Sequence, residues 1–135
     1  MYKNILVPVV FDPENTPDAA LEAAKALGEE GARITLLHVI EELPGYATSY
    51  VAADYIERSR ESVNQRLSEI AETIEGGEAA VIHGHSARSI LDWASDNDTD
   101  CIIVSSHKPG LQDYFLGGTA ARVVRYAQCA VHVIR

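Results

Sequence analysis

Cysteine is scarce in this chain of 135 residues, which contains only Cys101 and Cys129. The two residues do not form a CxxC pair, and they are too few for a disulfide scaffold or a cysteine-based zinc site. Long apolar runs are also missing, because nowhere do 18 consecutive apolar residues occur. From Met1 the chain enters the run Ile5–Val10, which is typical of a first strand and not of a signal peptide. We therefore expect a cytoplasmic protein with no membrane segment.

Basic residues are few: 11 Lys and Arg stand against 20 Asp and Glu, which gives a net charge of -9. This balance disfavours nucleic acid as a partner. A small anion could still bind, because backbone amides and a helix N-terminus act locally whatever the net charge. With 47% hydrophobic and 23% charged residues, the chain has the composition of a globular protein, and its length fits one domain over 1–135.

Several nucleotide and hydrolase motifs are absent. The sequence has no Walker lysine loop, no GxGxxG and no GxSxG, so motor ATPases, dehydrogenases and esterases have no motif behind them. We assign no catalytic residue.

What the sequence does contain is an alternation of short apolar runs and amphipathic segments. Strands are expected at 4–10, 33–40, 79–83, 101–105 and 130–134, and helices at 17–27, 51–74, 86–94 and 119–127. Thr16 and Ser86 are the expected N-caps of two of these helices. Five strands alternating with four helices predict a Rossmann-like, doubly wound parallel sheet of order 3-2-1-4-5. In such sheets ligands bind beyond the carboxyl ends of the strands, so the loops after strands one, two and four are the place to look.

Gly117-Gly118-Thr119 is the sharpest local signal. It stands directly before a helix, so amide groups, the helix dipole and a hydroxyl would converge as in a phosphate site, and glycines permit left-handed backbone angles. His107 and Lys108 could add positive charge there. The alternative is a tight turn before a helix that Thr119 caps.

The whole chain resembles the universal stress protein family, from MYKNILVPV through LLHVI and DCIIVSSHKP to GGTAARVVRYAQCAVHVIR. The resemblance implies a five-stranded α/β fold and a stress-response protein that forms a homodimer through its last strand, here 129–135. In one branch of the family it also implies ATP, with or without magnesium, bound between the first and fourth strands. That branch carries the loop G-x2-G-x9-G-[ST].

The match to this loop is partial. Ser105 and Lys108 stand at the first two glycine positions, and nine residues after Lys108 come Gly118 and Thr119; counting back from the last helix selects Gly117 instead. Both registers stay open. The cofactor-binding set that the resemblance implies is Pro8, Val9, Val10, Asp12, Val39, Gly84, Ser105, His107, Lys108, Gly117, Gly118 and Thr119.

The end of the first strand also departs from the family pattern. The family aspartate two residues after the strand-one proline is replaced by Val10, and the first acid is Asp12. Asp12 either takes over that role after a shift or belongs to a turn over 12–15. Val39 matches the position whose backbone meets adenine in the family.

The histidines suggest a metal only weakly. His83 and His85 flank Gly84 and could chelate a metal, which with Asp12 would give a metal-dependent hydrolase, but solvated loop histidines are the better explanation. His38 and His132 lie within apolar strands, where a hydrogen-bonded structural role is expected.

Two main hypotheses follow. The first is a cytoplasmic, homodimeric stress-response protein that binds ATP as a ligand or sensor, with at most slow ATP hydrolysis or autophosphorylation. The alternative is a nucleotide-free dimeric interaction or signalling module acting through residues 41–60, which Val10, Ser105 and Lys108 favour. The protein partner is not identifiable from the sequence.

Overall fold

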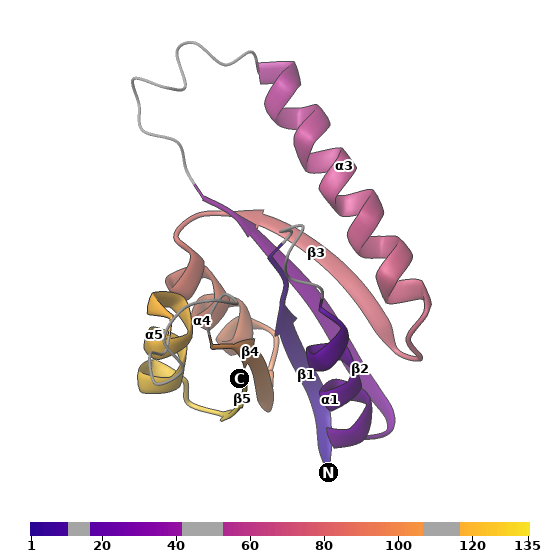
Figure 1. Ribbon diagram of the computed structural model, residues 1–135, viewed down its shortest axis with the longest axis vertical. Helices are drawn as coiled ribbons and strands as arrows, with labels where there is room; N and C mark the ends of the chain where they lie inside the picture. Colours follow the sequence, from indigo (N-terminus) through magenta and orange to yellow (C-terminus); the bar gives the residue numbers. More distant parts are fainter. Residues whose placement is uncertain (11–16, 42–52, 107–116) are drawn as a thin grey trace.

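The computed structural model describes residues 1–10, 17–41, 53–106 and 117–135, with only the backbone described at 53–56. Its elements are β1 (Tyr2–Pro8), α1 (Asp18–Leu27), β2 (Gly28–Ile40), α3 (Ala53–Glu72), β3 (Gly77–His83), α4 (Ser86–Asp96), β4 (Cys101–Ser105), α5 (Gly118–Tyr126) and β5 (Ala130–Ile134) (Figure 1). The five strands form one parallel sheet in the order β3-β2-β1-β4-β5. The predicted α/β fold and strand order are confirmed. No helix within these residues is long and apolar enough to cross a membrane.

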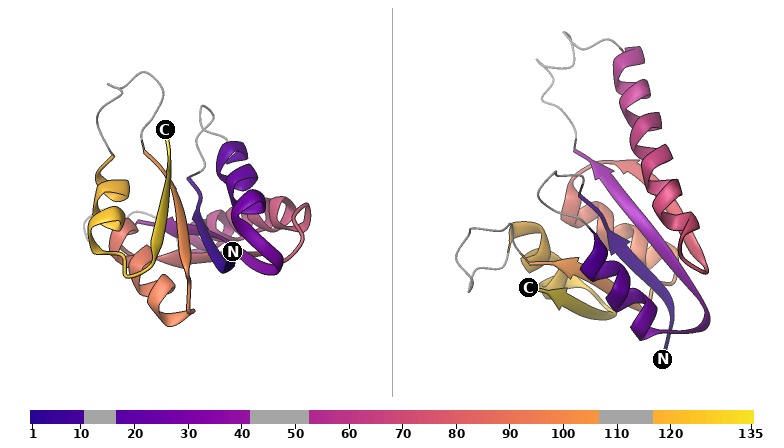
Figure 2. Two further views of the ribbon diagram at one scale, coloured as in Figure 1. Left: turned by 90° about the horizontal axis from the view of Figure 1, so that it is seen from below. Right: turned by 45° about the vertical axis from the view of Figure 1, so that its right-hand side comes forward.

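Helices cover both faces of the sheet. Figure 2 shows α1 and α3 on one face and α4 and α5 on the other. Two hydrophobic clusters follow from this arrangement: Ile5, Val7, Leu36 and Leu67 belong to the first, and Leu6, Leu37, Ile90, Ile102 and Val123 belong to the second. Successive β1 side chains alternate between the clusters, which explains why its sequence is apolar without interruption.

Two details of the predicted elements were wrong. Strand β2 begins at Gly28, not at 33, because Gly28 leaves α1 with an extended backbone (φ -76, ψ 138) and pairs with Tyr2 before the register shifts to Asn4 and Arg33. The N-cap of α1 is Pro17 and not Thr16. Ser86, and Thr119 as the alternative cap of the last helix, lie inside α4 and α5, whose N-caps are His85 and Gly117; none of these three N-caps forms a side-chain hydrogen bond.

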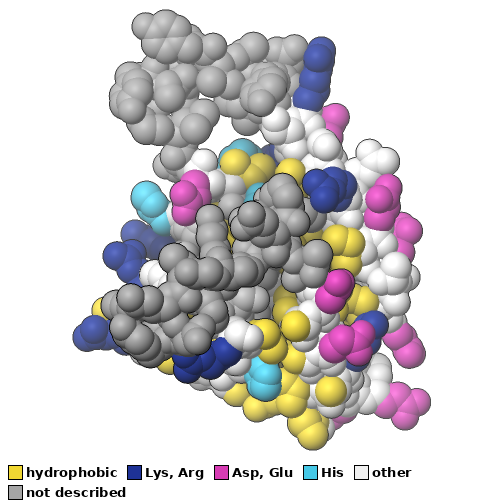
Figure 3. Space-filling model, in the orientation of Figure 1, with side chains coloured by type: hydrophobic (Ala, Val, Ile, Leu, Met, Phe, Trp, Pro, Cys, Tyr) yellow, Lys and Arg dark blue, Asp and Glu magenta, His cyan; other side chains and the backbone are white. Residues whose placement is uncertain are grey.

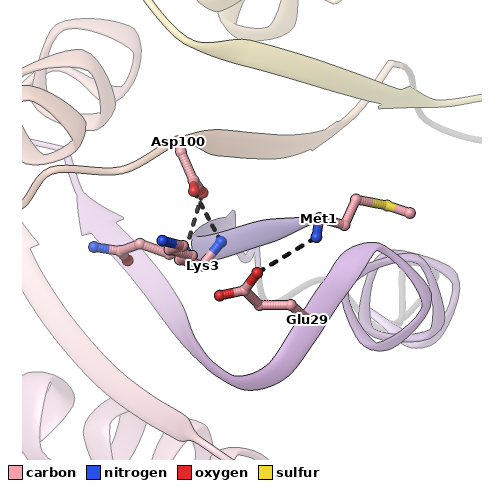
Figure 4. A network of polar contacts seen from close by, with 5 residues as sticks. Met1, Lys3, Glu29 and Asp100 are labelled. Atoms are coloured by element: carbon pink, nitrogen blue, oxygen red, sulfur yellow. Dashed lines mark hydrogen bonds and ion pairs between the residues drawn. The ribbon is translucent and has the colours of Figure 1, made fainter.

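Strands β1 and β4 are joined at their amino ends. The Asp100 carboxylate, directly before β4, accepts hydrogen bonds from the backbone amides of Lys3 (2.8 Å) and Asn4 (3.0 Å) (Figure 4). Met1 is held nearby, where its amino group forms an ion pair with Glu29 at 3.4 Å. These contacts set the register in which Ile5 pairs with Cys101 and Leu6 with Ile102.

Beyond those two pairs, β1 and β4 follow different neighbours. β1 continues along β2 as far as Pro8 opposite Leu37, and the Val9 amide donates to the Leu37 carbonyl (2.8 Å). β4 continues along β5, and the Ser106 amide donates to the Ile134 carbonyl (2.8 Å). The carboxyl end of β1 therefore pairs with β2 and that of β4 pairs with β5, so that β1 and β4 separate there.

Both cysteines are free thiols: Cys101 is the first residue of β4, and Cys129 directly precedes β5. Burial, with the neighbouring Cys129 thiol and the Asp100 carboxylate as lesser causes, raises the pKa of Cys101 from 9.0 to about 11. Burial and Asp100 also raise the pKa of Cys129. Both thiols therefore stay protonated at neutral pH and behave as small apolar side chains.

This pKa shift predicts a pH dependence of stability. A thiol whose pKa is higher in the folded state stabilises the fold fully below its unfolded pKa of 9.0, and this contribution is lost as pH rises through about 11. Urea unfolding of wild type should therefore show a falling free energy of unfolding across that window. Cys101→Ala should be less stable at pH 7 but lose less stability from pH 9 to 11. Parallel curves for the two proteins would show that Cys101 does not contribute to the slope.

Candidate functional site

A cavity of about 380 Å³ opens at the carboxyl edge of the sheet, where β1 and β4 part. This volume lies in the range of small-molecule sites, about 300–1,000 Å³. Its described lining comes from the ends of β1, β2 and β4 and the starts of α1, α4 and α5: Pro8, Val9, Val10, Pro17, Ala20, Leu37, Val39, Ser86, Ile90, Val104, Ser105, Ser106, Gly117, Gly118, Thr119 and Ala120. The cavity is therefore at the topological switch point of the sheet, as the sequence predicts.

One end of the cavity presents backbone amides. The Gly117 amide donates to the Ser106 carbonyl, and the Gly117 carbonyl accepts from the Ala121 amide (2.8 Å). The amides of Gly118, Thr119 and Ala120 belong to the first turn of α5, where a helix offers no acceptor. No acceptor for them is found in the described part of the chain. This end can therefore donate hydrogen bonds to an anion and adds the positive end of the helix dipole.

Two further helices begin at the same cavity. Pro17, the N-cap of α1, and Ser86, the first residue of α4, both belong to the lining. All three helices start here because each follows a parallel strand at its carboxyl end, so their dipoles present partial positive charge to one volume.

The other end of the cavity is apolar. Leu37 and Val39 of β2 and Ile90 of α4 line it. His38, the residue between the two β2 side chains, points its Nδ1 at the Val9 carbonyl (2.8 Å), a bond in which the ring nitrogen donates. This contact ties the end of β1 to β2 and gives His38 the structural role expected of it.

The structure brings together eight of the twelve sequence-predicted site residues. Pro8, Val9, Val10, Val39, Ser105, Gly117, Gly118 and Thr119 line the cavity, whereas Gly84 does not. Asp12, His107 and Lys108 lie outside the described residues. Ser86 and Ser106 line the cavity but were not predicted. In the sequence, Ser86 was a candidate N-cap and not a candidate ligand residue. No local sequence pattern indicated that Ser106 would line a binding site.

Gly117 and Gly118 differ in what the absence of a side chain allows at each position. Gly117 has φ -58 and Gly118 lies within α5, so the left-handed backbone expected at Gly118 was wrong. A Cβ on Gly117 would lie 2.8 Å from the Ser106 carbonyl oxygen, so this position requires a close backbone approach. A Cβ on Gly118 would meet nothing within 4 Å. Gly118 therefore leaves open space beside the cavity.

The metal hypothesis gains no support from the described residues. His83 and His85 are both exposed. In the ranges that the structure describes, no group of three or more His, Cys, Asp and Glu side chains is arranged to hold a metal ion.

The chain matches known proteins along its whole length. The sequence model of the universal stress protein family matches residues 1–135. Universal stress protein A homolog 2 of Coxiella burnetii is 36% identical, with 99% of this chain and 95% of that protein covered.

Solved structures share the fold. Universal stress protein UspA from Lactobacillus plantarum superposes with a TM-score of 0.73 at 26% identity, covering 99% of this chain and 98% of that one. The universal stress protein from Archaeoglobus fulgidus in complex with dAMP has a TM-score of 0.65 at 19% identity, with coverages of 99% and 98%, and shows the fold alone. The family match over every residue, together with the 36% identity, establishes that this chain belongs to the universal stress protein family.

Proposed function

We propose that this protein binds an adenine nucleotide, with ATP as the first candidate, in the cavity between β1 and β4. In this proposal it acts as a ligand-binding or sensing protein of the stress response in the cytoplasm, and as a homodimer. The observation that carries the proposal is a single cavity with an apolar end at Leu37, Val39 and Ile90 and an amide-lined end at Gly118–Ala120. A nucleotide has the same two parts, a flat apolar base and a chain of phosphates.

The distribution of charge supports an anionic ligand at the α5 end. Within the described ranges, the charged side chains from β4 onward are Arg122, Arg125 and Arg135, although the whole chain has a net charge of -9. Figure 3 shows acidic side chains gathered on the side that carries α1 and α3. The repulsion that this charge creates is therefore weakest where phosphates would enter.

ATP, with or without magnesium, is the first probe. The universal stress protein from Archaeoglobus fulgidus was solved in complex with dAMP, so adenine nucleotides are the ligand class to test here. None of the described lining residues is Asp or Glu, so in this proposal any magnesium is held mainly by the phosphates.

The part of the lining that the structure describes supplies binding groups and no general acid or base. None of the described lining residues is Asp, Glu, His, Cys, Lys or Arg. These residues can orient a nucleotide and exclude water from its base, but they cannot move a proton at neutral pH. This supports a ligand or sensor function with at most slow ATP hydrolysis or autophosphorylation.

A homodimer through residues 129–135 is the second part of the proposal. β5 is the last strand of the sheet and pairs on one side with β4. Val131, Val133 and Ile134 are only partly buried, and Ala130 and His132 are exposed. An uncovered edge strand of this kind exposes unpaired backbone groups, which a second copy of β5 would satisfy.

Replacing Gly118 with valine tests the phosphate site. The added side chain would enter open space beside the cavity without a left-handed backbone to strain, so we expect ATP affinity to fall more than about tenfold, or about 1.4 kcal/mol. Calorimetry on both proteins measures the change, and circular dichroism confirms that the variant is folded. Unchanged affinity of the variant for ATP would contradict the placement of the phosphates at the amino end of α5. No heat and no thermal shift from wild type with millimolar ATP and magnesium would favour the nucleotide-free interaction module.

Replacing Val133 with lysine tests the dimer. A charge on the β5 edge would oppose strand pairing, and we expect sedimentation to show a shift from dimer to monomer or to aggregate. Val124→Lys is the matched control, because Val124 is 44% exposed on α5 and lies outside the pairing strand. A wild-type protein that sediments as a monomer at micromolar concentration would contradict the proposal.

A further inference from the structure

Ser86 and Glu41 form a polar pair at the apolar end of the cavity. The Ser86 hydroxyl donates to the Glu41 carboxylate, with an Oγ to Oε1 distance of 2.9 Å. Ser86 begins α4 and lines the cavity, whereas Glu41 directly follows the last residue of β2. The Gly84 amide donates to the Ile40 carbonyl (3.0 Å), which fixes the end of β3 beside Glu41. This backbone bond holds the segments that carry Ser86 and Glu41 beside each other.

This pair gives the apolar end of the cavity a hydrogen-bond acceptor and no donor from Ser86. A serine hydroxyl has one proton and two acceptor lone pairs. Because the Ser86 proton is engaged by Glu41, its oxygen can only accept a hydrogen bond from a ligand. Among the described lining residues the other polar side chains are Ser105, Ser106 and Thr119, which belong to the β4 and α5 end. Ser86 is thus the polar side chain that the described lining offers beside Leu37, Val39 and Ile90.

We propose that Ser86, oriented by Glu41, selects a purine with a 6-amino group over a 6-oxopurine. This inference rests on the proposed nucleotide site, with phosphates at the α5 end and the base at the β2 and α4 end. Adenine would donate a proton from its 6-amino group to the Ser86 oxygen. Hypoxanthine and guanine place a carbonyl oxygen at the same position, where two acceptors would face each other without a proton.

Glu41 acts through Ser86 and is therefore a positioning residue. Its carboxylate accepts the hydroxyl proton and keeps it turned away from the cavity. Without Glu41 the hydroxyl is free to rotate and to donate toward the ligand. Loss of Glu41 and loss of Ser86 should consequently reduce discrimination in opposite ways.

Titrations with ATP and with ITP, which differ at the 6-position of the base, test this inference. Wild type should bind ATP at least about tenfold more tightly than ITP, because the site leaves an acceptor unpaired with the wrong base. Ser86→Ala should weaken ATP about three- to tenfold and leave ITP nearly unchanged. Glu41→Ala should instead strengthen ITP, with a smaller effect on ATP.

Ser89→Ala is the matched control. Ser89 lies on α4, and its amide donates to the His85 carbonyl (2.8 Å) one turn from Ser86, but it does not line the cavity. This variant should keep the wild-type ratio. Equal affinity of wild type for ATP and ITP, or equal effects of Ser86→Ala and Ser89→Ala, would overturn the selective role of Ser86 while leaving nucleotide binding intact. Failure of wild type to bind either nucleotide would overturn the proposed function, and the role of Ser86 with it.

Discussion

The cavity depends on how briefly β1 and β4 are paired. Asp100 fixes their amino ends through the amides of Lys3 and Asn4, and ladder pairing then covers only Ile5 and Leu6 of β1. Beyond Leu6 of β1 and Ile102 of β4, each strand continues to pair only with its outer neighbour. Because each strand is still held by its outer neighbour, β1 and β4 can part at the centre of the sheet, and a ligand volume results.

Parallel topology then determines what surrounds that volume. Since α1, α4 and α5 each follow the carboxyl end of a strand, all three begin at the same edge, and their first residues line one cavity. An acidic protein can in this way offer local positive potential built from backbone groups. The fold thus explains why a chain with a net charge of -9 is compatible with an anionic ligand.

The sequence predicted the strands and their order well because both depend on local patterns. Uninterrupted runs such as 101–105 can only be buried on both faces, and their alternation with amphipathic segments restricts the topology. It failed where distant segments meet. The Ser86 bond to Glu41 joins residues 45 positions apart, and Gly117 is constrained by the Ser106 carbonyl across a loop. Residue preferences for helix caps and for glycine turns consider only neighbouring residues. They therefore predicted Ser86 as an N-cap and a left-handed backbone at Gly118, and both predictions were wrong.

Amide chemical shifts measured during an ATP titration would test the central claim most directly. A nitrogen-15 labelled sample reports each backbone N–H separately, including those of Gly118, Thr119 and Ala120, which have no acceptor among the described residues. The account predicts that these three amides shift most, together with Val39 and Ser86 at the base end, while residues of the opposite sheet edge such as Gly31 stay unchanged. Saturating ATP that leaves the α5 amides unmoved, or that moves a different surface, would contradict it.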